Sequence, residues 1–100
     1  MAAMEMILFV GAPGAGKSTF FQMRFRETHI RINLDMLRTR HRENGLIDAC
    51  LAFKQGFVVD NTNPTAADRA KYIAKARAAG FSVVCYFFDA SIESMIARNA

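Results

Sequence analysis

Short apolar runs alternate with amphipathic stretches along the chain. Residues 5–10 form a mostly apolar run of strand length, and residues 57–59 form a second one, typical of strands buried on both faces. A weaker run at 30–33 and a longer one at 82–88 predict two more strands. Helical stretches separate these runs, and we expect helices over 17–27, 35–42, 46–55, 64–79 and 91–98.

Glycine, asparagine and proline mark the expected ends of these helices. A break is expected at Asn44 and Gly45, and Gly56 is expected to end the third helix. Asn63 is expected to cap the fourth helix, with Pro64 at its first position. Because strands alternate with helices, the strands should pair in parallel through right-handed crossovers. The expected fold is therefore α/β, with a short, mostly parallel sheet of about four strands flanked by helices in three layers.

The composition fits one small domain spanning residues 1–100. Apolar residues make up 52% of the chain and charged residues 22%, which suffices for a core and excludes a disordered chain. The first apolar run is far too short to cross a bilayer, and no basic segment precedes it as in a secretory signal. Two cysteines and two histidines make a zinc site or a disulfide framework implausible. We therefore expect a cytoplasmic, intracellular protein with reduced cysteines and no membrane partner.

Basic residues are concentrated in about a fifth of the chain. Thirteen lysines and arginines against nine acids give a net charge of +4. Such a cluster could follow a nucleic-acid backbone, although a charged run is usually a solvated helix face. The clustered residues are Arg24, Arg26, Arg31, Arg38, Arg40 and Arg42.

Residues 11–18 match the phosphate-binding pattern G-x-x-x-x-G-K-[ST], between a predicted strand and a predicted helix. In this pattern the glycines allow a tight turn whose N–H groups face phosphate oxygens, and the following helix adds its positive end. Lys17 would reach the β- and γ-phosphates of ATP, Ser18 would bind Mg²⁺, and Thr19 would approach the α-phosphate. The alternative is a glycine-rich turn with no ligand. The remaining residues expected to bind phosphate are Gly11, Ala12, Pro13, Gly14, Ala15 and Gly16.

Two aspartates follow predicted strands, at the edge where ligands collect in an open parallel sheet. Asp35 lies three residues before Arg38 on a predicted helix, so their side chains can share one face. The Asp35 carboxylate could then accept a proton from a hydroxyl group, and the Arg38 guanidinium would keep that carboxylate ionised. The same spacing also suits a helix N-cap with a surface ion pair. Asp60 ends a buried strand, where an acid commonly serves Mg²⁺ directly or through water. Its alternative is an Asx-type cap of the turn over 60–63.

Three segments resemble the kinase domain of the polynucleotide kinase/phosphatase family, in the same order along the chain. They are the segment at 10–19, the Asn-Leu-Asp-Met-Leu-Arg run at 33–38, and Val-Asp-Asn-Thr-Asn-Pro at 59–64. The stretch over 54–80 is also similar, so the resemblance covers nearly the whole chain. It implies the fold of the P-loop NTPases and transfer of the γ-phosphate of ATP to a 5′-hydroxyl of single-stranded or end-exposed DNA or RNA.

The resemblance also implies roles for individual residues. Lys17 and Ser18 would handle ATP and Mg²⁺, Asp35 would be the general base, and Arg38 would hold the acceptor and the base. Asp60 would order the water shell of the metal. The family often has a basic residue where this chain has Leu34.

The family carries an arginine-bearing lid after the fourth strand. Arg98 is the candidate for one lid arginine that contacts ATP, while a second would lie beyond Ala100. We expect either a truncated reading frame, a lid from a partner chain or oligomer, or weak catalysis. Two other functions stay open: a P-loop kinase for a small molecule, and a nucleotide-binding module with little turnover.

Overall fold

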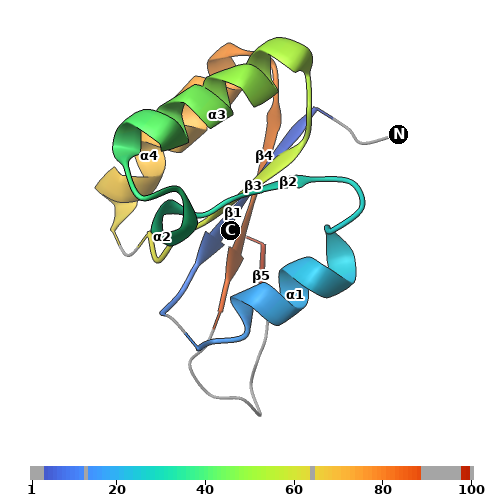
Figure 1. Ribbon diagram of the computed structural model, residues 1–100, viewed down its shortest axis with the longest axis vertical. Helices are drawn as coiled ribbons and strands as arrows, with labels where there is room; N and C mark the ends of the chain where they lie inside the picture. The colour runs from blue at the N-terminus through green and yellow to red at the C-terminus, as the bar shows by residue number, and fades with distance from the viewer. Residues whose placement is uncertain (1–3, 13, 64, 89–97, 100) are drawn as a thin grey trace.

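The computed structural model describes residues 4–12, 14–63, 65–88 and 98–99, and it contains a sheet with the strand order β2-β3-β1-β4-β5 (Figure 1). Strands β1 to β4 run parallel, and the two-residue β5 pairs antiparallel with β4. The predicted α/β class with a mostly parallel sheet is confirmed. The strands are β1 (Glu5–Val10), β2 (Ile30–Ile32), β3 (Phe57–Asp60), β4 (Ser82–Phe87) and β5 (Arg98–Asn99). The helices are α1 (Lys17–Arg24), α2 (Leu34–Leu37), α3 (Arg40–Phe53) and α4 (Ala66–Ala78).

Helices cover both faces of the sheet and so give the predicted three layers. Figure 1 shows α3 and α4 together on one side and α1 on the other. The alternation of side chains along β1 explains this division, because neighbouring residues of a strand point to opposite faces. Met6 and Leu8 join the core shared with α3 and α4, whereas Ile7 and Phe9 join the core shared with α1.

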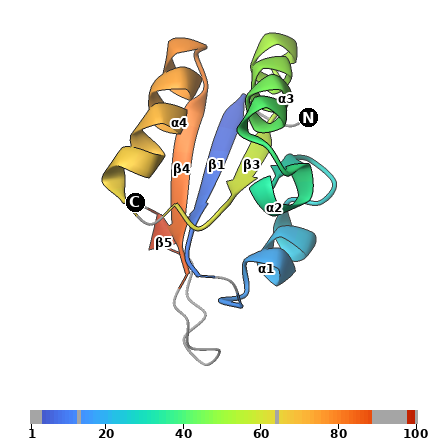
Figure 2. The same cartoon turned by 60° about the vertical axis from the view of Figure 1, so that its left-hand side comes forward.

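The central strand β1 lies between β3 and β4, and Figure 2 shows these three strands side by side. Phe9 pairs with Asp60 and Val10 pairs with Phe87. The carboxyl ends of the three strands therefore meet at one edge of the sheet. This register brings the glycine-rich loop that follows β1 next to the acid that ends β3.

The predicted helix break at Asn44 and Gly45 is wrong, because α3 runs through both residues. The chain breaks earlier, at Arg38, whose φ of 80° ends the one-turn α2. Thr39 then caps α3 by accepting a hydrogen bond from the Arg42 N–H. A lone interior glycine weakens a helix by only about 1 kcal/mol, and burial of the α3 face outweighs that loss.

Two other predicted helix ends also lie elsewhere. Helix α3 ends at Phe53, and Lys54 rather than Gly56 takes the left-handed conformation, with φ 60°. Helix α4 is capped by Thr65 and not by Asn63, because the Thr65 hydroxyl and the Asp68 carboxylate form a reciprocal capping box. Asn63 is instead buried, and its Nδ2 donates to the Phe9 carbonyl at 2.9 Å.

The predicted helix over 91–98 falls largely outside the described residues, as does the predicted helix position of Pro64. At Arg98 the helix prediction is wrong, because its backbone lies in β5 opposite Phe87. Among the described residues, no helix has the length and apolar character needed to cross a membrane.

Candidate active site

The loop between β1 and α1 forms a turn that depends on glycine. Gly14 has φ 83° and Gly16 has φ 93°, both in the left-handed region that favours glycine. Gly11 passes close to the end of β4, since a Cβ placed on it would lie 3.0 Å from the Phe88 Cβ. Ala15 is buried and its N–H donates to the Ala12 carbonyl at 3.2 Å. Pro13 lies outside the described residues.

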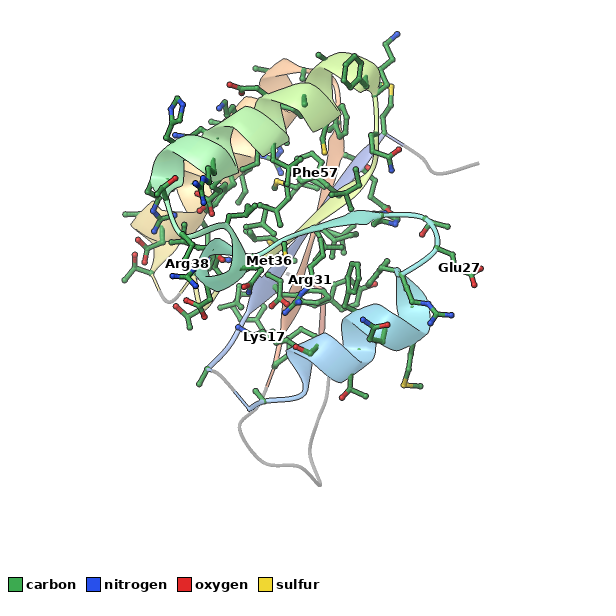
Figure 3. All side chains as sticks on the ribbon, viewed as in Figure 1. Lys17, Glu27, Arg31, Met36, Arg38 and Phe57 are labelled. Atoms are coloured by element: carbon green, nitrogen blue, oxygen red, sulfur yellow. The ribbon has the colours of Figure 1, made fainter. Side chains whose placement is uncertain are left out.

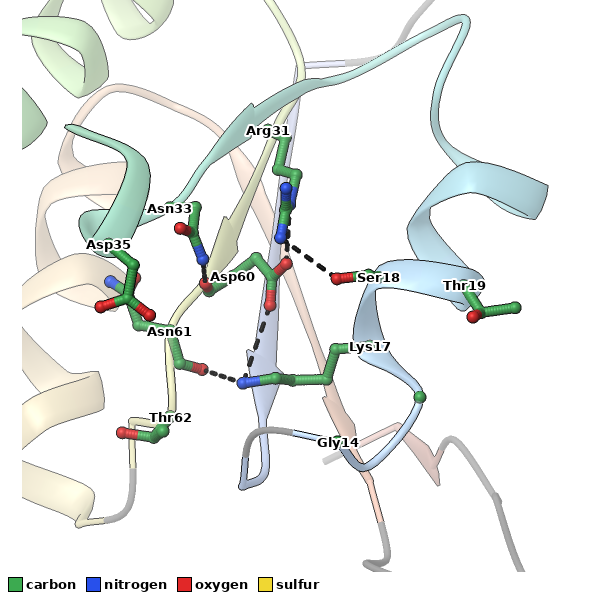
Figure 4. Close-up of a pocket in the computed structure, with 11 residues that line it drawn as sticks. Gly14, Lys17, Ser18, Thr19, Arg31, Asn33, Asp35, Asp60, Asn61 and Thr62 are labelled. Carbon is green, nitrogen blue, oxygen red and sulfur yellow. Dashed lines mark hydrogen bonds and ion pairs between the residues drawn. The ribbon is translucent and has the colours of Figure 1, made fainter. Parts of the chain in front are cut away.

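Lys17, at the start of α1, folds back over the loop. Its Nζ donates to the Gly11 carbonyl at 2.8 Å and to the Asn61 carbonyl at 3.1 Å, and lies 3.7 Å from Asp60 Oδ1 (Figure 4). Burial lowers the pKa of Lys17, while the nearby Asp60 and, more weakly, Asp35 act to raise it. The ammonium group is therefore already placed between the two strand ends.

A cavity of about 400 Å³ opens in front of this lysine. It combines residues from three separate segments, 14–19, 31–35 and 60–62, which the parallel sheet brings to one edge. Asp35 lies in the same cavity as Lys17 and Ser18, whereas Arg38 is not among its lining residues. The lining residues are Gly14, Gly16, Lys17, Ser18, Thr19, Arg31, Asn33, Asp35, Asp60, Asn61 and Thr62.

Asp60 is the buried acid of this cavity, with 1% of its surface exposed. Its Oδ2 accepts a hydrogen bond from Arg31 Nε at 2.8 Å, and Arg31 Nη2 also donates to Ser18 Oγ at 3.2 Å. Within the described residues its carboxylate makes no hydrogen bond to the turn that follows, so the Asx-cap alternative is wrong. Asp60 Oδ1 is buried without a hydrogen-bond partner.

These groups fit a magnesium ion bound with a nucleotide. Mg²⁺ takes oxygen ligands and commonly uses one or two protein groups, with water and phosphate oxygens completing its shell. Ser18 Oγ and Asp60 Oδ1, which accepts no hydrogen bond among the described residues, are oxygens of this kind in one cavity. Arg31, which contacts both residues, would have to share or give up these contacts when the ion binds.

Two asparagines set the position of Asp35. Asn33 caps α2 by accepting from the Met36 N–H at 2.9 Å, and its Nδ2 donates to the Asp60 carbonyl at 2.7 Å. Asn61 Oδ1 accepts from the Leu34 N–H at 2.8 Å. The start of α2 thus donates to the end of β3 through both Asn33 Nδ2 and the Leu34 N–H.

The N-cap alternative for Asp35 is wrong, because Asn33 fills that position. Among the described residues, Asp35 and Arg38 form no ion pair, because Arg38 leaves the helix at its positive φ. Figure 3 shows Arg31 near Lys17, whereas Arg38 lies on the side of α2 away from these two residues. The carboxylate of Asp35 is exposed and free to face a ligand.

Asp35 also lines a second cavity, of about 290 Å³, on the side of α3 and α4. Two cations, Arg40 and Lys71, and one further acid, Asp68, contribute to this cavity. Asp35 therefore stands between the space in front of the phosphate loop and the space beside α4. The other lining residues are Leu34, Asn61, Thr62, Asn63 and Tyr72.

Four arginines of the cluster have different partners. Arg24 lies over the Phe20 ring and Arg26 lies near Glu27. Arg31 is engaged in the first cavity and Arg40 with the buried Glu43. These four arginines thus engage different groups, and the use of the cluster along a nucleic-acid backbone stays a prediction.

Sequence reasoning missed the contributions of Arg31, Asn33, Asn61 and Glu43. Arg31 carries a usable signal, since a charged residue between two isoleucines in a strand of a parallel sheet needs a partner. Asn33 and Asn61 directly follow or end strands, where short amide side chains often satisfy backbone groups. Nothing in the sequence distinguishes Glu43 from an exposed acid, because its helix carries many charged residues.

Comparisons with known proteins show what this chain is similar to. A family described as an AAA domain matches residues 42–100. The bifunctional polynucleotide phosphatase/kinase of Schizosaccharomyces pombe is 30% identical over 90 residues, covering 89% of this chain and 22% of that protein. A putative bifunctional polynucleotide phosphatase/kinase of Acanthamoeba polyphaga mimivirus is 32% identical over 74 residues, covering 73% of this chain and 18% of that protein. The chain thus spans about a fifth of the length of these relatives.

Among solved structures, the APS kinase of Mycobacterium tuberculosis has a TM-score of 0.64 at 17% identity, covering 89% of this chain and 78% of that one. This likeness supports the fold of the P-loop kinases. The chain therefore belongs to the AAA-domain family and is a P-loop kinase domain related to those of polynucleotide phosphatase/kinases.

Proposed function

We propose that this domain transfers the γ-phosphate of ATP to the 5′-hydroxyl of a DNA or RNA strand. The observation that carries the proposal is the presence of Asp35 in one cavity with Lys17 and Ser18. A phosphate loop alone binds a nucleotide, but a kinase for alcohols also needs a base that faces the transferred group. The polynucleotide kinases among the relatives favour a nucleic-acid acceptor.

In the proposed reaction, ATP lies along the loop with its phosphates against the N–H groups at 14–19. Lys17 would exchange its contacts with the Gly11 and Asn61 carbonyls for phosphate oxygens. Ser18 and Asp60 would hold Mg²⁺, which supplies charge neutralisation at the phosphates when bound. Arg31, already hydrogen-bonded to both residues, adds positive charge to the same space.

Asp35 is the proposed general base. Its carboxylate accepts the proton of the 5′-hydroxyl while the hydroxyl oxygen forms a bond to the γ-phosphorus. The bond between that phosphorus and the bridging oxygen breaks at the same time, which releases ADP. The exposed Arg38 and the lid candidate Arg98 are proposed to contact acceptor and donor phosphates. Positioning and charge neutralisation supply most of the acceleration in such a reaction.

The acceptor is proposed to approach through the second cavity. Asp35 lines both cavities, so a hydroxyl that enters from the side of α4 meets the base and the γ-phosphate together. Arg40 and Lys71 provide positive charge for a phosphodiester at that entrance. The modest size of this cavity also suits a small acceptor, so a small-molecule kinase is the second candidate.

Transfer of labelled γ-phosphate from ATP to a 5′-hydroxyl oligonucleotide tests the proposal. The matched control is the same oligonucleotide with a 5′-phosphate, which lacks the attacking group. We expect label on the first oligonucleotide and none on the second. Transfer only to a free nucleoside or to APS would establish the small-molecule alternative. ATP binding without transfer to any of these acceptors would establish a binding module.

A further inference from the structure

Glu43 is a completely buried carboxylate outside the cavity in front of the phosphate loop. It lies in the first turn of α3, and 0% of its surface is exposed. Carboxylates are almost never buried to this extent unless they are paired and hydrogen-bonded, because they lose their hydration. An apolar residue of similar volume would fill this space without that penalty. The partners of the carboxylate therefore indicate what it does.

Three side chains donate to the two oxygens of Glu43. Arg40 Nη1 donates to Oε1 at 2.9 Å, and the Tyr72 hydroxyl lies 3.1 Å from both oxygens. Asn61 Nδ2 donates to Oε2 at 2.8 Å. Burial, and next the Glu43 charge, raise the pKa of Tyr72, so its hydroxyl stays protonated as a donor. The three donors come from α3, from α4 and from the turn after β3.

Asn61 connects this buried group to both halves of the candidate active site. Its Oδ1 accepts from the Leu34 N–H at 2.8 Å, directly before Asp35. Its main-chain carbonyl accepts from Lys17 Nζ at 3.1 Å. One residue thus contacts the start of the helix that carries the proposed base and the amine of the phosphate loop.

The amide of Asn61 must have one orientation for these contacts to form. An ionised carboxylate accepts hydrogen bonds and donates none, so it attracts the NH₂ end of the amide and leaves the oxygen end for the Leu34 N–H. Without an acceptor at position 43, the amide can rotate and the N-terminus of α2 loses a partner. An error of about 1 Å at a reacting group can reduce a rate by about a hundredfold.

We propose that Glu43 is a positioning residue, which orients Asn61 and thereby holds the α2 turn so that Asp35 faces the phosphate loop. This inference rests on the proposed kinase function for its kinetic consequence, but the orientation of Asn61 is testable separately. Glu43 lines neither cavity and reaches Asp35 through Asn61, whereas its contact with Arg40 leads to the second cavity.

The kinetic test compares Glu43→Met with Glu43→Gln. Methionine fills the space but accepts no strong hydrogen bond, so we expect kcat to fall about tenfold to a hundredfold, with KM for ATP changed less than about twofold. Glutamine keeps an oxygen for Asn61 and can turn its NH₂ toward the Tyr72 hydroxyl, so most of kcat should return. Cys50→Ala, a buried change on the same helix away from Asn61, is the control for lost packing and should keep kcat.

Several results would overturn the proposal. One is a folded Glu43→Met protein with the kcat of the original chain. Another is a loss of kcat that is equal in Glu43→Met and Glu43→Gln. A third is a loss of kcat in Cys50→Ala as large as that in Glu43→Met. If Glu43→Met fails to fold, Asn61→Ala takes its place, because the Lys17 contact uses the main chain and survives. A normal kcat in Asn61→Ala would equally refute the positioning role.

The side-chain amide signals of Asn61 in ¹⁵N NMR spectra separate this inference from the kinase proposal. We expect two widely separated NH₂ proton signals in the original chain and in Glu43→Gln, and signals near those of a free amide in Glu43→Met. Identical Asn61 signals in all three proteins would refute the orientation by Glu43. If the NMR signals change as expected but no phosphate is transferred to oligonucleotides, the kinase proposal is refuted and the orientation of Asn61 by Glu43 is not.

Discussion

Arg31 Nε donates to Asp60 Oδ2 at 2.8 Å and joins the edge strand β2 to the buried end of β3. The acid is almost fully buried, while the Arg31 side chain is 31% exposed. The carboxylate has only one other cation within 4 Å, since Lys17 Nζ lies 3.7 Å from Oδ1 among the described residues. Arg31 is therefore the group that both compensates Asp60 and contacts Ser18.

Replacing Arg31 by methionine should lower the free energy of unfolding by about 1–3 kcal/mol, because a buried carboxylate loses a charged donor. Partial exposure of Arg31 keeps the expected loss below that of a fully buried pair. Urea denaturation without nucleotide measures it. Arg26→Met removes the exposed pair with Glu27 and should change stability by less than about 0.5 kcal/mol. Equal effects of the two changes would contradict this account.

Asp35→Asn should abolish phosphate transfer while ATP still binds. Asparagine has nearly the same shape but accepts no proton, so the rate should fall at least about a hundredfold. Lys17→Ala should weaken both ATP binding and transfer, because its amine is the group proposed to hold the phosphates. Titration of a fluorescent ATP analogue and the labelled-transfer assay measure the two properties. Intact transfer in Asp35→Asn would show that another group takes the proton.

Gly11→Ala should destabilise the fold by about 1–3 kcal/mol, since the new methyl group would lie 3.0 Å from the Cβ and carbonyl oxygen of Phe88. Phe88 directly follows β4, and its N–H donates to the Val10 carbonyl at 2.8 Å, which keeps it next to Gly11. Gly14 is the matched control, because its Cβ would meet no atom within 4 Å and only its φ of 83° disfavours alanine. We expect a smaller loss there in thermal unfolding. A larger loss at Gly14 would mean that backbone strain, not close approach, governs this loop.

Gly45→Ala should raise stability by about 0.5–1 kcal/mol, because Gly45 lies inside the continuous α3 and alanine is the better helix former. A Cβ at this position would meet no atom within 4 Å. The midpoint of urea unfolding should rise without a change in slope. A loss of stability would indicate that the helix does bend at this glycine.

Thr65→Ala should remove the N-cap of α4 and lower stability by about 1 kcal/mol at neutral pH. Hydrogen bonds from the Thr65 side chain and backbone lower the pKa of Asp68 below 3.8 in the folded state. A lowered carboxyl pKa contributes stability above the unfolded value, and that contribution disappears as the pH falls through the folded value. The difference between the two proteins should therefore shrink below pH 3.8.

Thr39→Ala provides the control for this pH dependence. Thr39 caps α3 through the Arg42 N–H, and within the described part of the chain no carboxylate accepts a hydrogen bond from Thr39. Its loss should be similar at neutral and acid pH. A pH-independent difference for Thr65→Ala would contradict the role of Asp68.

The order of strands and helices could be predicted because buried strands and glycine-rich turns have strong local patterns. The apolar run of β1 and the phosphate loop are examples, and each depends on residues close in sequence. The start of α3 could not be predicted, because Arg38 takes a positive φ that its residue type does not favour. The N-cap of α4 was likewise predicted at Asn63 but lies at Thr65, because the Asn63 side chain donates to the Phe9 carbonyl, far away in sequence.

At the candidate site, residue types indicated Lys17, Ser18, Asp35 and Asp60, and the structure brings all four into one cavity. The supporting contacts depend on which strands become neighbours. Arg31 meets Asp60 only because β2 pairs with β3, and no local pattern specifies that pairing. The ring of donors around Glu43 depends in the same way on the packing of α4 against the sheet.

The central place of β1 has a consequence for how the chain reaches its native state. Met6 pairs with Phe57 and with Val83, so β1 is synthesised well before both of its neighbours, which lie in the second half of this sequence. Pairings between such distant segments form slowly. During synthesis this apolar segment must wait unpaired, exposed to aggregation or bound by a chaperone. The phosphate loop therefore acquires its shape late, after the last parallel strand has joined the sheet.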